Sequence, residues 1–588
     1  MEKLQGMGAI VAGSGVGFRV WAPHADAVEV AGEFTEAGIA LESEDDGYWY
    51  GFVEGARPGQ QYRFTIVNGN ERLDRIDPYA AEVTNSVGTG VIYDHSAFDW
   101  EGDDFTPPTL DRLVIYELHA GTFAAKRDGE VAGLEAIATR FDHLLALGVN
   151  AIQLMPVAEF AGDVSWGYNP SHIFAVESAY GGPDALKQLV KDAHRAGLAV
   201  IQDVVYNHFG PSDLDLWRFD GWSENDLGGI YFFNDWRSKT PWGDTRPDYG
   251  RGEVRQFIHD NAFSWLEQFH VDGLRYDMTP YMRSVDAGEE NIPEGWTLCH
   301  WINTDIRAAH PRKILIAEDL HSDPSVSSTA PDGGGFHAQW DSQFVHPVRE
   351  AVTLADDRWR STAEVAAAIS YSYGDPFARV IYTESHDEVA NGRARVPEEV
   401  DPDDPTGYWA QKRSTLGAAL VLTSPGIPML FQGQEFLEGG WFRDTVALDW
   451  SQNADFHGIV RLYRDLVALR LNRAGVSAGL TGGGLEVFHN NDEANVLGFH
   501  RWRDHGPGDD VVVVVNLSND TLDDYRIGFP AAGEWSLLLN SDAKVYSDAF
   551  GDNDSFDVLA TDEPYDGFGA SAAISIAPYS ALIYSLKG

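Results

Sequence analysis

The sequence predicts a chain of three parts: an N-terminal β-sandwich, a central (β/α)8 TIM barrel and a C-terminal antiparallel β domain. Short alternating strands fill the first part, and apolar strands then alternate with amphipathic helical patterns until the β texture returns near residue 476. A chain of 588 residues is too long for one hydrophobic core. We therefore expect domains at residues 1–105, 106–475 and 476–588.

The expected N-terminal domain consists of short strands separated by glycine, proline and acidic turns. Alternating patterns cover residues 18–23, 27–30, 48–53 and 61–66. This spacing of strands and turns is typical of a β-sandwich. The segment Phe105-Thr106-Pro107-Pro108 has the composition of a linker to the next domain.

The central part contains eight candidate strands with helical patterns between most of them. The candidates are residues 113–118, 151–157, 198–205, 272–278, 313–319, 337–341, 378–385 and 427–433. In the first helical pattern, apolar residues recur from Leu134 to Leu145 at helical spacing. Eight alternating units indicate a barrel rather than an open sheet. Glycine-rich phosphate loops do not follow these strands, which argues against a nucleotide-binding fold.

Two further stretches complete the expected architecture. Residues 206–252 are far longer than an ordinary βα loop and are rich in aromatics, aspartate and glycine, so they read as a functional excursion over the C-terminal face of the barrel. Beyond residue 476, strand patterns at 496–499, 511–515, 535–539 and 581–585 predict the antiparallel β domain.

The composition excludes several classes of partner. The formal net charge is -49, and such a field repels nucleic acid and anionic membranes but suits a neutral substrate. A salt-rich cytoplasm and an ordinary acidic enzyme explain this charge equally well. The sequence shows no signal peptide at its start and no apolar segment long enough for a transmembrane helix. We therefore expect a cytoplasmic protein. The single cysteine, Cys299, is expected to be a buried helix residue.

Polar residues lie at the C-terminal ends of the candidate strands. The active site of a (β/α)8 barrel is built at these ends. Arg275 and Asp277 are two residues apart and project to the same side of a strand, so the arginine would keep the carboxylate ionised. Alone, such a pair is more typical of a structural ion pair. Other strand ends, however, contribute three further acids and two flanking histidines; together these are Asp203, His208, Glu318, His386 and Asp387. Convergent carboxylates of this kind can cleave a glycosidic bond.

The segments 203–208, 273–277, 317–319 and 385–387 resemble, in order, the four signature segments of the α-amylase superfamily, glycoside hydrolase family 13. The resemblance covers nearly the whole chain. It implies that Asp277 is the nucleophile of a retaining mechanism and that Glu318 is the general acid and base, with a raised pKa. It also implies that Asp387 grips sugar hydroxyls and favours the transition state.

The same resemblance implies substrate-binding roles for five residues. Arg275 would orient the nucleophile, His208 and His386 would donate hydrogen bonds to sugar hydroxyls, and Asp203 would support this network. Tyr168, in Trp166-Gly167-Tyr168-Asn169-Pro170, matches the tyrosine on which a sugar stacks, and we favour this role over that of a core aromatic.

The resemblance leaves the reaction open. The N-terminal segment resembles a family 48 carbohydrate-binding module, and residues 249–257 and 448–450 are similar to 1,4-α-glucan branching enzymes. Residues 203–208 instead resemble amylases and debranching enzymes, and residues 117–123 and 277–282 resemble maltooligosyltrehalose trehalohydrolases. We favour branching of an α-glucan or malto-oligosaccharide, with an amylase-like hydrolase, a trehalohydrolase or a debranching enzyme as alternatives and an inactive glucan-binding protein as a distant one.

No cofactor and no metal ligand set is expected from the sequence. Several relatives of this superfamily bind calcium at the excursion after the third strand, where Asn207 and nearby acids could contribute oxygens. The sequence shows no defined ligand loop there, so calcium is an unsupported option and surface acids are the simpler reading.

Overall fold

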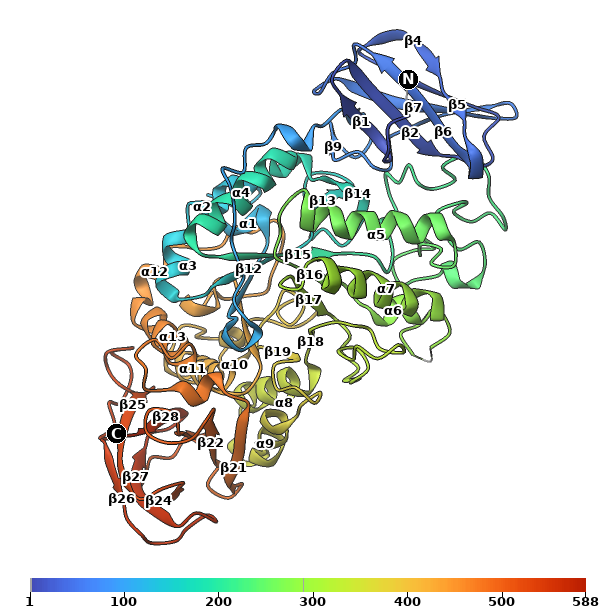
Figure 1. Cartoon of the computed structure of the whole chain (residues 1–588). Coiled ribbons are helices and arrows are strands. Elements are labelled where there is room, and N and C mark those ends of the chain that lie inside the picture. Colours follow the sequence, from blue (N-terminus) through green and yellow to red (C-terminus); the bar gives the residue numbers. More distant parts are fainter. Residues whose placement is uncertain (1–2, 289) are drawn as a thin grey trace.

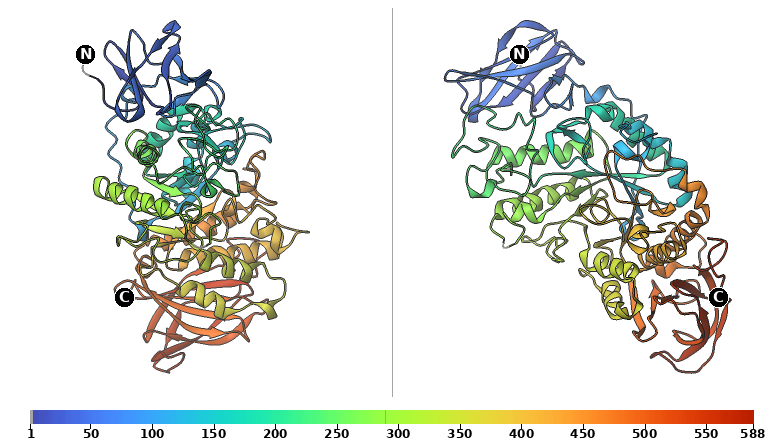
Figure 2. Two further views of the ribbon diagram at one scale, coloured as in Figure 1. Left: turned by 90° about the vertical axis from the view of Figure 1, so that its right-hand side faces the viewer. Right: turned by 180° about the vertical axis from the view of Figure 1, so that it is seen from behind.

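The computed structural model describes residues 3–288 and 290–588. Figure 1 shows three parts in a row: the N-terminal β domain, the barrel and the C-terminal β domain, with the two termini at opposite ends of the molecule. Figure 2 shows the same elongated arrangement from two further sides. The predicted fold class is therefore confirmed for the described part of the chain.

The N-terminal domain is a sandwich of two antiparallel sheets. One sheet has the strand order β1-β2-β6-β5, and the other has the order β4-β3-β7-β10-β9 with β8 beside β7. Buried aliphatic and aromatic side chains such as Phe18, Val28 and Phe64 lie between the sheets. The strands are β1 Gly8–Ala12, β2 Gly15–Trp21, β3 Ala27–Gly32, β4 Thr35–Ala40, β5 Glu42–Ser43, β6 Tyr48–Glu54, β7 Gln61–Asn68, β8 Glu71–Arg75, β9 Glu82–Val83 and β10 Gly90–Val91.

Within the described residues, eight parallel strands close into a barrel in the order β11-β12-β15-β16-β17-β18-β19-β20. All eight coincide with the candidate strands of the sequence. They are β11 Ile115–Leu118, β12 Ala151–Leu154, β15 Ala199–Val204, β16 Gly273–Tyr276, β17 Ile314–Ala317, β18 Ala338–Trp340, β19 Arg379–Ile381 and β20 Ile427–Phe431. Nearly every residue in these strands is buried, because helices cover the outside and side chains fill the inside.

Helices surround the barrel (Figure 1). They are α1 Ala120–Phe123, α2 Leu134–Ala138, α3 Phe141–Leu147, α4 Gly182–Ala196, α5 Gly252–Glu267, α6 Pro280–Arg283, α7 Pro293–Ala309, α8 Ser342–Thr353, α9 Thr362–Ser370, α10 Val396–Val400, α11 Tyr408–Thr423, α12 Gln452–Asp455 and α13 His457–Arg470. Cys299 lies fully buried in α7, as expected. No described helix is long and apolar enough to cross a membrane.

The first helical pattern forms two short helices rather than one. The backbone leaves the helical region at Arg140, with φ -111° and ψ 4°, and the Thr139 hydroxyl donates to the Ala136 carbonyl just before the break. Leu134 and Leu144 are buried, but Leu145 is exposed. The apolar spacing was correct for the buried face, and the polar Thr139-Arg140 pair interrupts the helix.

The long stretch 206–252 contains one regular element, η5 Trp236–Ser238, among its described residues and packs against the N-terminal domain. Buried Asp220 accepts from the backbone N–H of His24 at 3.0 Å, and the Asn68 side chain donates to the Asp220 carbonyl at 2.9 Å. Trp222 stacks on His24. Nearer the barrel, Trp242 stacks on His208. We expected the whole stretch to lie over the C-terminal face of the barrel. Only the part around Trp242 lies there, whereas the part around Asp220 and Trp222 contacts the N-terminal domain.

The C-terminal domain packs two antiparallel sheets against each other. The larger has the order β21-β22-β23-β28-β25-β26, and β24 pairs with β27. Their facing side chains form a separate apolar core that includes Val512, Phe529 and Trp535. The strands are β21 Gly484–Asn491, β22 Val496–Trp502, β23 Val511–Asn516, β24 Leu522–Phe529, β25 Gly533–Asn540, β26 Val558–Ala560, β27 Ala570–Ile576 and β28 Ser580–Leu586.

A buried ion pair joins this domain to the barrel. Lys412 on α11 donates from Nζ to Oδ1 of Asp542 at 2.6 Å, and the two side chains are 0% and 1% exposed. Asp542 follows β25 and also accepts from the backbone of Asn553. A buried ion pair of this kind makes the docking of the two parts sensitive to either partner.

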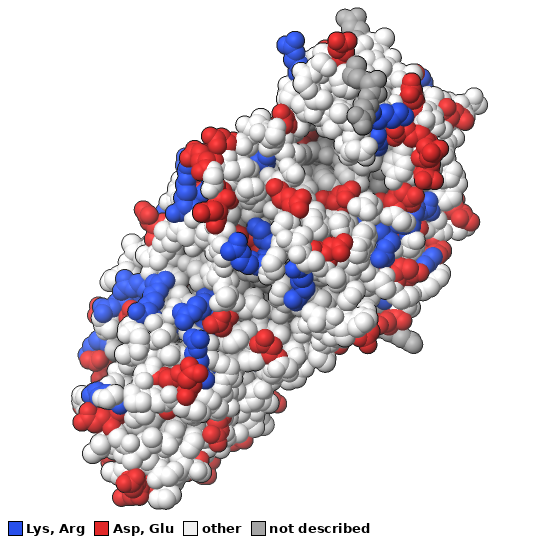
Figure 3. Space-filling model, viewed as in Figure 1, with Lys and Arg blue, Asp and Glu red and all other residues white. Residues whose placement is uncertain are grey.

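On the face drawn in Figure 3, acidic side chains are not confined to one region. Figure 3 shows acidic side chains spread along the whole length of one face, over all three parts. This distribution accords with the general excess of acid in the composition.

Replacing Lys412 by methionine should destabilise the chain by about 3–5 kcal/mol, because the carboxylate of Asp542 would stay buried without its cation. The shift of the urea unfolding midpoint measures this. Lys544→Met, at an exposed lysine two residues beyond Asp542, is the matched control and should leave the midpoint unchanged. Equal midpoints for both variants would contradict the assigned role of the pair.

Candidate active site

The candidate residues come from neighbouring strands of the barrel and meet at its C-terminal end. β15, β16 and β17 lie side by side, with Asp203 paired to Arg275 and Tyr276 paired to Ala317 in the parallel register. Asp277 and Glu318 are the next residues along β16 and β17. The parallel register therefore delivers both acids to the same rim of the barrel.

Arg275 is the centre of the cluster. Its guanidinium is fully buried and donates from Nη1 to Asp203 at 2.7 Å and to Asp277 at 3.2 Å. Nη2 lies 2.7 Å from Oε2 of Glu318. The indole of Trp340, on β18, lies 4.2 Å from the guanidinium carbon and covers the cation from another side. One arginine thus contacts three carboxylates.

Asp277 is held on both oxygens. Arg275 donates to Oδ1, and the side-chain amide of Asn207 donates to Oδ2 at 2.7 Å. Burial, and after it the negative charge of Glu318, raise the pKa of Asp277 well above its usual range, while Arg275 opposes the shift. The neighbouring carboxylate of Glu318 thus adds to the effect of burial on Asp277. The raised pKa that the sequence led us to expect at Glu318 stays a prediction.

Glu318 is held through one oxygen. Oε2 faces Arg275 and accepts from the backbone N–H of Met278 at 3.0 Å. Met278 has a φ of +35°, a backbone conformation that non-glycine residues rarely adopt. This strained residue turns its N–H toward Glu318 directly after the nucleophile candidate, and such strain is concentrated at functional sites. These contacts leave Oε1 as the oxygen that can face a leaving group.

Asp203 and Tyr168 form the adjoining wall. The Tyr168 hydroxyl donates to Oδ2 of Asp203 at 2.7 Å, the same oxygen that Arg275 contacts. Burial raises the pKa of Asp203 to about 6, against the opposing charge of Arg275. Gly167 precedes Tyr168 with a φ of +94°, and a side chain there would lie 2.3 Å from the Pro156 carbonyl. The glycine allows the tyrosine to approach the strand ends.

His386 lies beside Tyr168, with the rings stacked at 5.0 Å. It donates from its backbone N–H to Glu117 at 3.0 Å, and Nδ1 lies 2.8 Å from the same carboxylate. Burial opposes its protonation most strongly, but Asp387 and Glu117 together raise the pKa of His386 to about 9. The other ring nitrogen lies 3.5 Å from Asp387, whose side chain is 44% exposed. Asp387 is therefore the candidate acid that is most open to solvent.

His208 is placed differently from the expectation. Nδ1 lies 2.5 Å from the Asn207 side-chain oxygen and Nε2 lies 2.9 Å from the Tyr168 carbonyl. Burial lowers the pKa of His208 to about 4, although the Tyr168 carbonyl opposes the shift. A sugar hydroxyl can take a hydrogen bond from His208 only if one of these protein contacts is given up.

The sequence reasoning missed three residues that hold the site. Glu117 anchors His386, Trp340 covers Arg275, and Asn207 positions Asp277. An acid inside the apolar strand β11 was a signal for Glu117, because unpaired buried charge is costly. Asn207 had been considered as a calcium ligand, but both polar atoms of its side chain contact Asp277 and His208.

The barrel and its cluster of acids define an enzyme that acts on glycosidic bonds. Residues 117–457 match the family described as the alpha amylase catalytic domain, and residues 487–587 match its C-terminal all-beta domain. Residues 6–80 match carbohydrate-binding module 48, the isoamylase N-terminal domain. The chain belongs to the α-amylase family, glycoside hydrolase family 13, so the resemblance is confirmed.

Curated relatives match almost the whole chain. It is 32% identical to the 1,4-alpha-glucan branching enzyme GlgB of Leifsonia xyli subsp. xyli, over 99% of this chain and 80% of that protein. It is 30% identical to the enzyme of the same name from Salinibacter ruber, over 98% of this chain and 96% of that one.

Solved structures share the fold. A putative alpha amylase from Salmonella typhimurium superposes with a TM-score of 0.75 at 22% identity, covering 99% of this chain and 100% of that one. Pullulanase from Bacillus acidopullulyticus superposes with a TM-score of 0.76 at 21% identity, covering 100% of this chain and 76% of that one. At these identities the likeness extends to the fold alone.

Two buried acids support the hairpin that carries Tyr168. The hairpin consists of β13 Ala158–Phe160 and β14 Pro170–Val176. Glu159 accepts from the backbone N–H of Ser178 at 2.8 Å, and Glu177 accepts from the backbone N–H of Phe160 at 3.2 Å. Burial, and after it the charge of Glu177, raise the pKa of Glu159 to about 8. The hairpin is therefore held by a carboxyl group that is neutral at neutral pH.

The raised pKa makes stability depend on pH. Between the ordinary pKa of 4.5 and about 8, the folded chain retains a proton at Glu159 that the unfolded chain has lost. Stability from this group therefore falls as pH rises through that window. Glu159→Gln keeps the accepting oxygen without the titration, so its melting temperature should fall less than that of the wild type between about pH 5 and about pH 9.

Glu135→Gln, at an exposed acid on α2, serves as the control and should follow the wild-type profile. Parallel profiles for Glu159→Gln and the wild type would contradict the assignment.

Proposed function

We propose that this chain is a 1,4-α-glucan branching enzyme that cleaves an α-1,4 bond with retention and transfers the cut chain to another glucan hydroxyl. The observation that carries the proposal is its similarity, along almost its whole length, to curated enzymes of that name. The cluster of acids at the barrel rim supplies the chemistry that the reaction needs.

In the proposed mechanism, Asp277 attacks the anomeric carbon while Glu318 donates a proton to the departing glycosidic oxygen. Arg275 and Asn207 fix the direction of the attacking carboxylate, and Glu318 must carry a proton when the bond breaks. The resulting glycosyl-enzyme bond is then broken by an acceptor hydroxyl. Glu318 takes the proton of that hydroxyl, so it ends the cycle protonated as it began.

The remaining candidates are proposed to bind the sugar. Tyr168 offers a ring for stacking, Asp387 is exposed enough to accept from sugar hydroxyls, and His386 carries a positive charge beside it. Asp203 and His208 are proposed to support the network from behind, through Tyr168 and Asn207.

The N-terminal domain is proposed to bind the same neutral polymer, since its sequence matches a carbohydrate-binding module. The net charge of -49 favours an uncharged glucan over nucleic acid or an anionic membrane as partner. We also propose a cytoplasmic location, where a branching enzyme meets stored glucan.

Amylose incubated with the chain should lose its iodine colour while reducing ends stay nearly constant, because transfer makes one new bond for each bond that is cut. Debranching of the product should then release short chains. Asp277→Asn should lower kcat by at least about 10⁴-fold, as loss of a nucleophile does. Its melting temperature should not fall, because the amide removes the repulsion from Glu318.

A rise in reducing ends that matches the loss of iodine colour would replace branching by amylase-like hydrolysis. Release of free trehalose from maltooligosyltrehalose would favour the trehalohydrolase alternative. Unchanged activity of Asp277→Asn would overturn the assignment of the nucleophile whichever reaction is found. Asp226→Asn, at an exposed acid in the 206–252 stretch, is the control for substitution of a carboxylate.

A further inference from the structure

A second cluster of chemically reactive side chains lies in the C-terminal domain, away from the barrel. His500 is on β22, Asp510 immediately precedes β23, and His505 lies in the loop 503–510 that joins these two strands. His500 and Asp510 are buried, and His505 is exposed. The hairpin therefore presents a site with a closed inner side and an open outer side.

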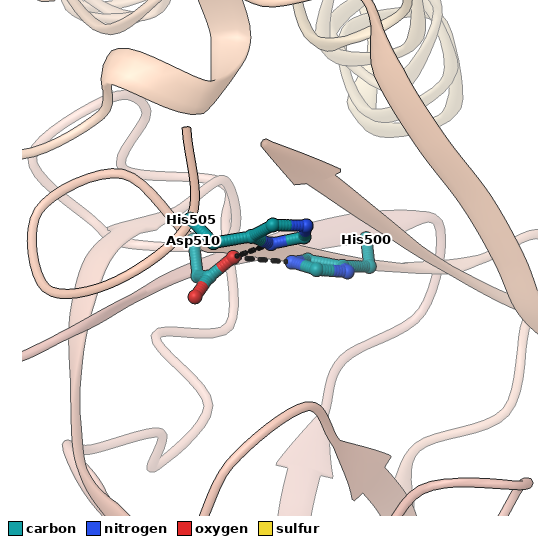
Figure 4. A group of neighbouring side chains, drawn as sticks. All are labelled: His500, His505 and Asp510. Atoms are coloured by element: carbon teal, nitrogen blue, oxygen red, sulfur yellow. Dashed lines mark hydrogen bonds and ion pairs between the residues drawn. The ribbon is translucent and has the colours of Figure 1, made fainter. Parts of the chain in front are cut away.

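The three side chains converge on one oxygen atom. Nε2 of His500 and Nδ1 of His505 each lie 2.9 Å from Oδ1 of Asp510. Figure 4 shows both rings directed at that oxygen. In the part of the chain that the structure describes, this is the one group of three His, Cys, Asp or Glu side chains whose ligand atoms all lie within 4.8 Å of one another.

Two imidazole nitrogens and a carboxylate oxygen form a donor set that suits zinc and its neighbours among the transition metals, whereas calcium and magnesium prefer oxygen alone. Zinc binds these donors at about 2.0–2.2 Å in a tetrahedral arrangement, so the donors lie about 3.3 Å apart. The present separations of 2.9 Å need to open by only a few tenths of an ångström.

The surroundings favour a cation in two ways. Asp510 is fixed by its second oxygen, which accepts from the backbone N–H of Gly506 at 2.8 Å. Glu486 lies directly opposite His500 in the antiparallel register and adds negative charge on the same face of the sheet.

We propose that His500, His505 and Asp510 bind a divalent transition metal ion, zinc by preference. The exposed side at His505 leaves room for water to complete the coordination. On binding, the ring nitrogen of each histidine coordinates the ion instead of forming its hydrogen bond to Asp510.

The contacts of the loop indicate what such an ion does. Gly508 accepts from the backbone N–H of Ala478 at 3.0 Å and donates to the carbonyl of Leu586 at 2.9 Å. Ala478 begins η8 Ala478–Thr481, which lies between the barrel helices and the C-terminal domain, and Leu586 ends β28. An ion that fixes the loop therefore stabilises the junction between the two domains.

Titration of the tag-free, chelator-treated full chain with zinc chloride in a calorimeter tests the proposal. We expect one ion per chain and a melting temperature that rises with zinc concentration. His505→Ala removes an exposed ligand without disturbing the core and should weaken zinc binding by at least about tenfold, the loss that even a supporting residue produces. Asp510→Asn should do the same.

His457→Ala, at an exposed histidine on α13, is the matched control and should bind zinc like the wild type. Cobalt in place of zinc should give the visible absorption of a tetrahedral site in the wild type and not in His505→Ala. Failure of the wild type to bind one equivalent, or equal zinc affinity in the wild type and His505→Ala, would overturn the proposal. The test is independent of glucan activity, which His505→Ala should leave intact.

Discussion

The candidate site depends on one buried guanidinium. Arg275 is the cation that three buried carboxylates share, and its two terminal nitrogens contact Asp203, Asp277 and Glu318. Three ionised carboxylates around one arginine would leave excess negative charge in a region of low dielectric. The cluster therefore retains a proton, as the raised pKa values of Asp203 and Asp277 indicate.

The barrel forms a frame that brings these residues into contact. Asp203, Asp277 and Glu318 come from adjacent strands whose parallel register is set by buried aliphatic residues. Around them lie the hairpin that carries Tyr168 and the stretch 206–252, in which Trp242 stacks on His208 and Asp220 contacts the N-terminal domain. The site is thereby connected to the domain that is proposed to hold the glucan.

Much of this arrangement could be predicted from the sequence. The eight barrel strands are short apolar runs, and polar residues at their ends mark the rim of the barrel. Both features can be read from neighbouring residues in the sequence. The residues that position the site could not be predicted in this way. Contacts of Glu117 with His386 and of Trp340 with Arg275 join distant strands, and the pKa of Asp277 depends on a balance of burial and charge that no spacing encodes. The helix break at Arg140 was missed for the converse reason, since the apolar period continues across it.

In the proposed mechanism, Asp277, held by Arg275, forms a covalent bond to the sugar while Glu318 supplies the proton. A glucosyl fluoride that carries a second fluorine on its sugar ring reacts slowly and should trap the covalent intermediate. Mass spectrometry of the digested chain should then place the added glucosyl mass on the peptide that contains Asp277. Label on Glu318 or Asp387, or turnover without a trapped intermediate, would contradict the account.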